Sequence, residues 1–200
     1  MESEESARLF TVGHSNLESE ALLELLLSAG VTALADVRSS PYSRRLPQFN
    51  RSALEAALRA AGIAYVFLGA ELGGRPASRD LYDPEGWADY ERMRKTDEFN
   101  DGLDRVRRGL ERYVVALMCG EEDPLDCHRG LMIAPALKER GLPPLHLRRG
   151  GRIETTAQFE ERLQLETGLG GLFAESLEEA YRVMNRRKAY RLERGEEEES

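Results

Sequence analysis

Short apolar segments alternate with amphipathic ones along the first two thirds of the chain. β-branched, aromatic and other apolar residues gather in segments that predict strands, at 9–13, 31–37, 63–68, 113–118 and 144–147. Segment 31–37 is apolar except for Thr32 and Asp36, as expected for a strand buried on both faces. Between the first two strands, apolar residues recur at spacings of three and four, which predicts an amphipathic helix that ends at Gly30.

Capping residues indicate where several helices begin. We expect caps at Ser15 or Asn16, at Ser52 with Glu55, at Asp126, and at Thr155 with Gln158. Further helices are predicted at 52–62, 87–95, 96–109, Cys127–Arg140, 155–166 and 177–192. Pro135 should kink or shorten its helix. The long polar connection 69–86 is typical of a binding loop or lid.

Strands alternating with helices predict an α/β fold, a single three-layer domain with a mostly parallel sheet and helices on both faces. We place this domain at residues 8–170 and a C-terminal helical extension at 171–194. Residues 1–7 and 195–200 are acidic and are expected to be tails, the second one disordered. The pattern does not specify an oligomeric state.

Composition and charge narrow the class of protein. The chain of 200 residues is 41% hydrophobic and 32% charged, as in ordinary globular domains. A net charge of −8 does not favour a nucleic-acid partner, although arginines 38, 44, 45 and 51 form a local basic cluster that could also face solvent. Apolar segments are too short to cross a membrane, and the acidic start does not resemble a signal peptide. We therefore expect a cytoplasmic protein with reduced cysteines and no membrane partner.

Each predicted strand ends in polar or glycine residues, and parallel strands place those ends at one edge, where ligands bind in open α/β sheets. These residues are His14, Ser15, Asp36, Arg38, Glu71, Gly73, Gly74, Cys119 and Glu121. His14 could act as a general base, with Asp36 orienting it. Alternatively, Asp36 and Arg38 form a structural ion pair.

The segment Cys119–Arg129 holds both cysteines of the chain. Cys127, His128 and Arg129 lie at a predicted helix N-terminus, where the helix dipole attracts anions and lowers the pKa of a thiol. Arg129 could bind phosphate or carboxylate. The alternative is a structural turn with a buried cysteine, a histidine that caps neighbouring carbonyl groups, and an arginine paired to Asp123 or Asp126.

A metal site and a cofactor are not predicted. Cys119, Cys127, His128 and His14 are acceptable zinc ligands, but their spacing lacks a C-x2-C pair. An arginine six residues after either cysteine, as in a phosphatase loop, is missing. Phosphate-binding and dinucleotide-binding glycine motifs are also missing.

The motifs taken together resemble the DUF488 family, a domain of unknown function. They are TVGHSN, DVRSSPYSRR, PQFN, GIAYVFLGAELGG and LMCGEEDPLDCHR, in this order between residues 11 and 129. The resemblance covers roughly residues 8–155 and implies a compact α/β fold with a site built from these segments. It also implies that Ser43 belongs to the site.

These observations lead to three hypotheses. The first is an enzyme acting on a small anionic, phosphate-bearing substrate such as a nucleotide, with Cys127 or Cys119 as nucleophile. His14, Asp36, Glu121 and His128 would assist catalysis. The substrate would be bound by Arg38, Ser15, Ser43, Arg129, Glu71, Gly73 and Gly74. The second hypothesis is a module that binds an anion or nucleic acid without catalysis, and the third is a metal-dependent hydrolase.

Overall fold

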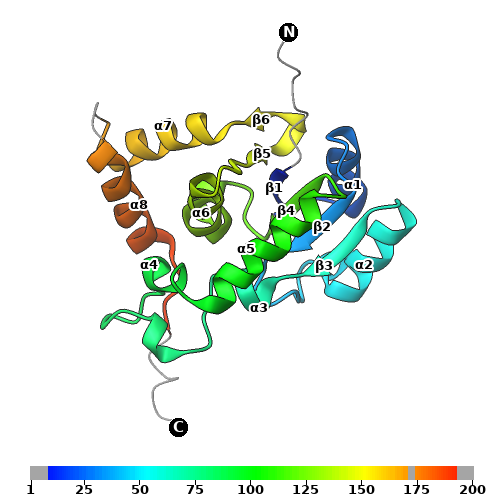
Figure 1. Ribbon diagram of the computed structural model, residues 1–200. Helices are drawn as coiled ribbons and strands as arrows, with labels where there is room; N and C mark the ends of the chain where they lie inside the picture. Colours follow the sequence, from blue (N-terminus) through cyan, green and yellow to red (C-terminus); the bar gives the residue numbers. More distant parts are fainter. Residues whose placement is uncertain (1–8, 171–173, 193–200) are drawn as a thin grey trace.

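The computed structural model describes residues 9–170 and 174–192, which form a sheet flanked by helices (Figure 1). In this part of the chain the sheet has six strands in the order β3-β2-β4-β1-β5-β6. They are β1 (Leu9–Gly13), β2 (Ala33–Asp36), β3 (Ala64–Phe67), β4 (Val115–Cys119), β5 (Leu145–Leu147) and β6 (Ile153–Glu154). Only the β5–β6 pair is antiparallel among the described strands. The predicted α/β class with a mostly parallel sheet is confirmed.

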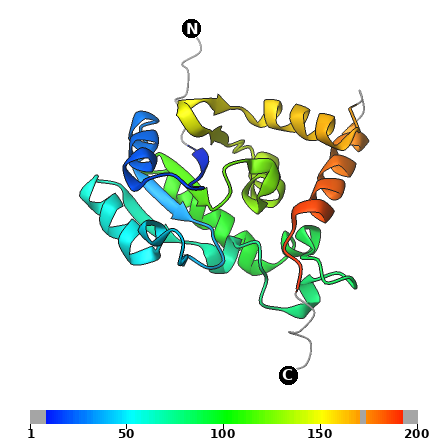
Figure 2. The same cartoon turned by 180° about the vertical axis from the view of Figure 1, so that it is seen from behind.

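Helices connect the strands and extend beyond them. The α-helices are α1 (Ser19–Ser28), α2 (Arg51–Ala60), α3 (Gly69–Leu72), α4 (Tyr90–Met93), α5 (Asp97–Leu110), α6 (Ala134–Glu139), α7 (Thr156–Thr167) and α8 (Ala174–Lys188). Shorter helical turns are η1 (Pro47–Phe49), η2 (Arg79–Leu81), η3 (Pro124–Asp126), the π-helical η4 (Arg129–Ile133) and η5 (Arg149–Gly151). Seen from behind, α1 and α2 lie on the opposite side of the molecule from α7 and α8 (Figure 2).

Successive residues of each central strand face two separate apolar cores, as the pleat requires. In β4, Val115 and Leu117 face one core, whereas Ala116 and Met118 face the other. Apolar residues of α1 and α2 belong to the second core, and those of α5, α6, α7 and α8 belong to the first. The sheet is therefore the middle one of three layers.

The segment after Cys127 is not the single helix that we expected from Cys127 to Arg140. The π-helical turn η4 comes first, and α6 begins only at Ala134. Pro135 lies in the first turn of α6, directly after η4, so the proline coincides with the change from π-helical to α-helical geometry. The expected cap at Asp126 is also wrong, because Asp126 lies in η3 and His128 occupies the N-cap position of η4. The carboxylate of Asp126 forms an ion pair with Lys188.

Two predicted capping boxes have opposite outcomes. Thr155 and Gln158 form the expected reciprocal box at the start of α7. Ser52 does not cap α2, because the helix already begins at Arg51 and Asn50 occupies the N-cap position. The amide oxygen of Asn50 accepts a hydrogen bond from the Ser43 backbone N–H at 2.6 Å, so it holds the preceding loop.

The middle of the chain contains more local structure than the predicted long connection. Helix α3 and the turn η2 lie within 69–86, whereas the helix expected at 87–95 is reduced to α4. Trp87 pairs with Arg191 in an isolated β-bridge. This contact joins the segment before α4 to the chain after α8.

Helix α8 packs against α7 and contributes Ala180 and Met184 to the first core. The boundary drawn at residues 170 and 171 stays a prediction. Residues 1–7 and 195–200, expected to be tails, lie outside the described residues. Among the described helices, none has the length and apolar character needed to cross a membrane.

Candidate functional site

The candidate site lies where the sheet changes its direction of winding. β1 and β4 are neighbours, and their last residues Gly13 and Cys119 are paired in register. α1, which follows β1, packs on one face of the sheet, whereas η4 and α6, which follow β4, pack on the other. The loops after these two strands therefore diverge, which leaves a crevice at their carboxyl ends.

A cavity of about 440 Å³ opens at this crevice. Its size is within the usual range for a small-molecule site. The predicted residues that line it are His14, Arg38, Ser43, Gly74, Cys119, Glu121, Cys127 and His128. They come from four separate segments of the chain, so the fold brings most of the predicted site together.

Two sulfur atoms and one imidazole nitrogen form a compact cluster in the wall of this cavity. The Nδ1 atom of His128 lies 3.6 Å from Sγ of Cys119 and 3.8 Å from Sγ of Cys127. The Nε2 atom of His128 is 2.9 Å from the carbonyl oxygen of Val37, to which it must donate a proton. Nδ1 is therefore the ring atom that faces the sulfurs and is able to accept a proton.

The two thiols differ in acidity. The hydrogen bond with Cys127 and burial raise the pKa of Cys119 well above its usual value. Burial alone would also raise the pKa of Cys127. The hydrogen bond from Cys119 and the positive charges of Arg129 and His128 outweigh burial and hold this pKa well below its usual value. Burial works against a charged His128, yet the Cys127 thiolate raises the pKa of the imidazole. Without a metal, Cys127 is the thiolate of the pair.

Glu121 brings a carboxylate to the same cluster. Its Oε2 atom lies 3.1 Å from Sγ of Cys119 and competes with Cys127 for the single thiol proton. Burial, together with the negative charge of Cys127, raises the pKa of this carboxyl. A carboxyl in this position can exchange protons with a molecule in the cavity.

Arg129 does not face the cavity. It is fully buried, and its guanidinium donates to the carbonyl oxygens of Glu121 and Glu122, each at 2.6 Å. Its backbone N–H points at the sulfur of Cys127, 3.5 Å away. Its observed contacts therefore hold the loop that carries Glu121, and the ion pair to a nearby aspartate that we considered is not formed.

Asp36 and Arg38 form a buried ion pair behind the cavity. The carboxylate of Asp36 accepts from Nε and Nη2 of Arg38 at 2.8 and 2.6 Å, and from the Tyr65 hydroxyl at 3.0 Å. Nη2 of Arg38 also donates to the carbonyl oxygen of Phe49 at 2.9 Å. Asp36 does not line the cavity, so its observed role is to hold Arg38 in place.

His14 is the remaining acceptor for Arg38. Its Nδ1 is 2.9 Å from the carbonyl oxygen of Ser15, to which it donates, and its Nε2 lies 3.2 Å from Nη1 of Arg38. Burial lowers the pKa of His14 to about 4, and the neighbouring Arg38 charge acts in the same direction. The imidazole is therefore neutral near pH 7, with its free lone pair directed at Arg38.

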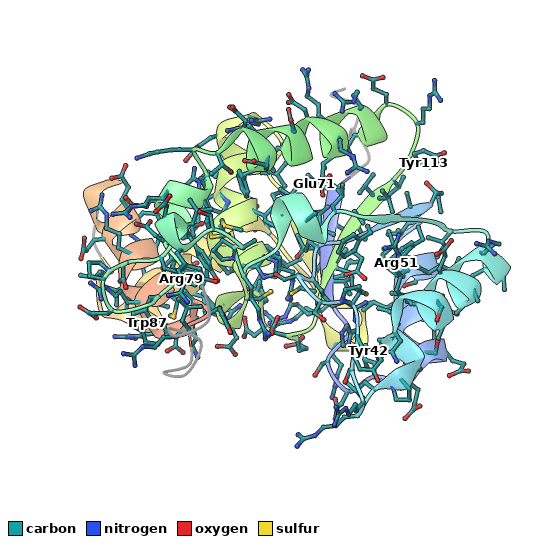
Figure 3. The ribbon with its side chains drawn as sticks, turned by 90° about the horizontal axis from the view of Figure 1, so that it is seen from below. Tyr42, Arg51, Glu71, Arg79, Trp87 and Tyr113 are labelled. Carbon is teal, nitrogen blue, oxygen red and sulfur yellow. The ribbon has the colours of Figure 1, made fainter. Side chains whose placement is uncertain are left out.

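Ser15 and Glu71 lie outside the cavity. Ser15 has a φ of 43°. Glu18 occupies the N-cap position of α1, so neither Ser15 nor Asn16 caps that helix. Glu71 pairs with Arg105 of α5. In Figure 3, Glu71 is well separated from Tyr42, which marks the cavity loop.

The two predicted glycines allow close packing around the cluster. A Cβ atom on Gly74 would lie 2.8 Å from Cγ of His128, and one on Gly73 would lie 2.3 Å from the carbonyl oxygen of Gly69. Gly74 lines the cavity, but Gly73 does not. Gly74 therefore leaves room for the imidazole ring.

Several lining residues were not predicted. They are Ser39, Ser40, Tyr42, Arg75, Tyr90, Gly120, Asp126, Lys188 and Tyr190. Arg75 follows Gly73 and Gly74 in the long connection that we predicted to be a binding loop or lid, and this position is a signal that could have identified it as a site residue. Lys188 and Tyr190 come from the segment that we treated as an extension, and nothing near them in the sequence points to the site. Tyr90 packs in the first core and also lines the cavity.

These features define an α/β protein with a Cys/His/Arg cluster at the carboxyl ends of its central parallel strands. The model of the family described as Domain of unknown function DUF488 matches residues 18–134, more than half of the chain. The protein therefore belongs to the DUF488 family, as its motifs indicated. Comparisons with curated proteins and with solved structures gave no match.

Proposed function

We propose that the protein is an enzyme that acts on a small anionic, phosphate-bearing substrate in the cavity at the strand ends. The supporting observation is that one cavity joins the cations Arg38, Arg75 and Lys188 to the cluster of two thiols, an imidazole and a carboxylate. Cations of this kind bind phosphate, and the cluster supplies groups for proton transfer and for attack on the substrate.

Arg75 is the best candidate for the first contact with an anion. Its guanidinium lies over the ring of Tyr190, 4.6 Å from the ring centroid, and no carboxylate of the described residues forms an ion pair with it. Lys188, in contrast, is paired with Asp126 at 2.6 Å. Stacking on an aromatic ring leaves the planar N–H donors of an arginine available at its edge.

Arg38 offers a second, more restricted contact. A guanidinium has five N–H donors, and Asp36, Phe49 and His14 take four of those of Arg38. The remaining donor, on Nη1, is available to a ligand. Hydroxyl groups of Ser39, Ser40 and Ser43 in the adjoining loop add further donors.

Glu121 is the proton carrier that the geometry supports best. It lines the cavity, whereas Asp36 is enclosed by its ion pair and His14 accepts from Arg38. The proposal includes a cytoplasmic location, because a reducing compartment would keep the two thiols free.

Binding of inorganic phosphate, measured by isothermal titration calorimetry, tests the first half of the proposal. We expect Arg75→Gln to weaken binding about tenfold, a loss of about 1.4 kcal/mol. Arg59→Gln is the matched control, because Arg59 is a highly exposed arginine of α2 outside the cavity. Equal affinities in the two variants, or no binding by the unmodified protein, would contradict the proposal.

Turnover distinguishes an enzyme from the non-catalytic binding module. The protein is assayed with a panel of phosphate monoesters and diesters that includes nucleotides, and Glu121→Gln is the comparison. We expect hydrolysis or transfer with at least one ester and a large loss in the variant. Phosphate binding that depends on Arg75, without turnover of any ester, would favour the binding module.

A further inference from the structure

We propose that Cys119, Cys127 and His128 bind one Zn²⁺ ion, with the fourth position of the ion open to the cavity. Their ligand atoms all lie within 4.8 Å of one another. Two sulfurs and one nitrogen form a donor set that favours zinc among the common divalent ions. The assignment rests on this geometry, whereas the use of the ion in catalysis rests on the function proposed above.

The distances match the edges of a coordination tetrahedron. Zn–S bonds of about 2.3 Å and Zn–N bonds of about 2.0–2.1 Å at a tetrahedral angle separate sulfur and nitrogen by about 3.6 Å. The observed separations from Nδ1 of His128 are 3.6 Å to Cys119 and 3.8 Å to Cys127. The two sulfurs thus lie at nearly equal distances from Nδ1, as ligands of one shared ion would.

The surroundings orient the imidazole as a ligand. Nε2 of His128 donates to the carbonyl oxygen of Val37, which directs the Nδ1 lone pair at the sulfurs. Histidine ligands of metals typically donate their second ring N–H in this way. The lack of a side chain at Gly74 leaves room for the ring.

The sulfurs are placed as metal thiolates commonly are. Cys119 and Cys127 are only 4% and 2% exposed, so thiolates here need positive charge close by. The backbone N–H of Arg129 points at the sulfur of Cys127. Cys119 ends β4, while Cys127 and His128 are held between η3 and η4, so rigid elements fix all three ligands.

Three protein ligands distinguish a catalytic zinc site from a closed structural one. All three residues line the cavity, and so does Glu121 beside them. The only other histidine in the cavity wall, among the described residues, is His14, whose free lone pair faces Arg38. The fourth position is therefore left for water or for an oxygen of the substrate, which the ion would polarise as a Lewis acid.

The spacing C-x7-C-H concealed this site in the sequence. Cys119 is at a strand end and the other two ligands follow a loop, so no short motif marks them. A ligand role for Cys127 also replaces its expected role as nucleophile, because a sulfur bound to zinc is not free to attack.

The test is the metal content of the full-length protein, made without a histidine tag and purified without chelator. Inductively coupled plasma mass spectrometry should find about one zinc ion per chain. Cys119→Ser and His128→Ala should each retain less than about a tenth of this amount. His14→Gln, which changes the other cavity histidine, should retain all of it and is the matched control.

If the variants do not fold, two measurements on the protein without substitutions still test the proposal. Co²⁺ added to the metal-free protein should produce sulfur-to-cobalt charge-transfer absorption, and alkylation of both cysteines should be slow until a chelator is added. A protein without zinc, without this absorption and with chelator-independent alkylation would overturn the proposal. So would zinc retained by folded Cys119→Ser and His128→Ala.

The zinc site and the proposed function can fail independently, and the experiments distinguish the two failures. Zinc in a protein that does not bind phosphate or turn over esters would support the metal site and reject the substrate assignment. Turnover that depends on Arg75, in a protein without zinc that alkylates rapidly at Cys127, would support the function and reject the metal.

Discussion

The ion pair of Asp36 with Arg38 makes a quantitative prediction. Asp36→Asn keeps the shape of the side chain but removes its charge, and it leaves the guanidinium of Arg38 buried without an anion. The carboxylate is fully buried and accepts two side-chain bonds from Arg38 and one from Tyr65. Removing one partner of such a pair typically costs about 3–5 kcal/mol. We expect a loss near the lower end, about 3 kcal/mol, because the asparagine oxygen can still accept one bond.

The assay is urea unfolding followed by circular dichroism and by the fluorescence of Trp87, the only tryptophan in the chain. In a thermal scan, the same loss would lower Tm by about 6–12 °C for a chain of this size. Glu55→Gln is the control, because the Glu55–Arg59 pair on α2 is exposed and should contribute less than about 0.5 kcal/mol.

A double-mutant cycle tests the physical reason. Asp36→Asn combined with Arg38→Gln removes both charges, so the double variant should lose about 2 kcal/mol less than the sum of the two single losses. Additive losses, or a loss below about 1 kcal/mol in Asp36→Asn, would refute the view that Asp36 acts mainly by holding a buried arginine.

Two further predictions concern the packing of the cluster and the acid stability of the fold. Gly74→Ala should lower the zinc affinity about tenfold or more, because its Cβ would lie 2.8 Å from Cγ of His128; unchanged affinity in a metal-competition titration would contradict this. Arg162→Gln should cost about 1–2 kcal/mol at pH 7, because Asp123 and Glu154 lose a hydrogen-bonded cation that helps to keep their pKa values below the usual range. That contribution is present above about pH 4.5 and is lost as the pH falls through the lowered pKa values. The urea midpoints of variant and parent should therefore draw together as the solution is made more acidic, and a gap independent of pH would exclude this cause.

The local pattern of apolar and polar residues was sufficient to predict the layers of the fold. The apolar strands alternate with helices, and short-range chemistry such as the Thr155–Gln158 box places the start of α7 correctly. Helix starts that depend on distant partners were missed. Asn50 occupies the N-cap position of α2 but its side chain makes no capping hydrogen bond to the helix. Its amide oxygen instead accepts from the backbone N–H of Ser43 in the neighbouring loop.

The sequence was sufficient to predict which residues gather at the site, but not the direction in which their side chains point. Parallel strands had to bring His14, Arg38 and Cys119 to one edge, and they do. The direction of a long side chain depends on partners that the sequence does not identify. Arg129 turns inward because two carbonyl oxygens of the preceding loop need donors, and Asp36 is enclosed because Arg38 and Tyr65 reach it from separate segments.

The end of α8 gives the cavity an outer wall that lies far along the chain from its reactive groups. Lys188 and Tyr190 line the cavity, whereas the match to the family ends at Ala134. This part of the cavity wall and the thiol cluster are thus encoded in different stretches of sequence. Substitutions around Lys188 can change the shape and charge of the cavity without altering the residues of the thiol cluster. A protein that shares the first stretch and differs in the second would keep the thiol cluster and present a different cavity wall.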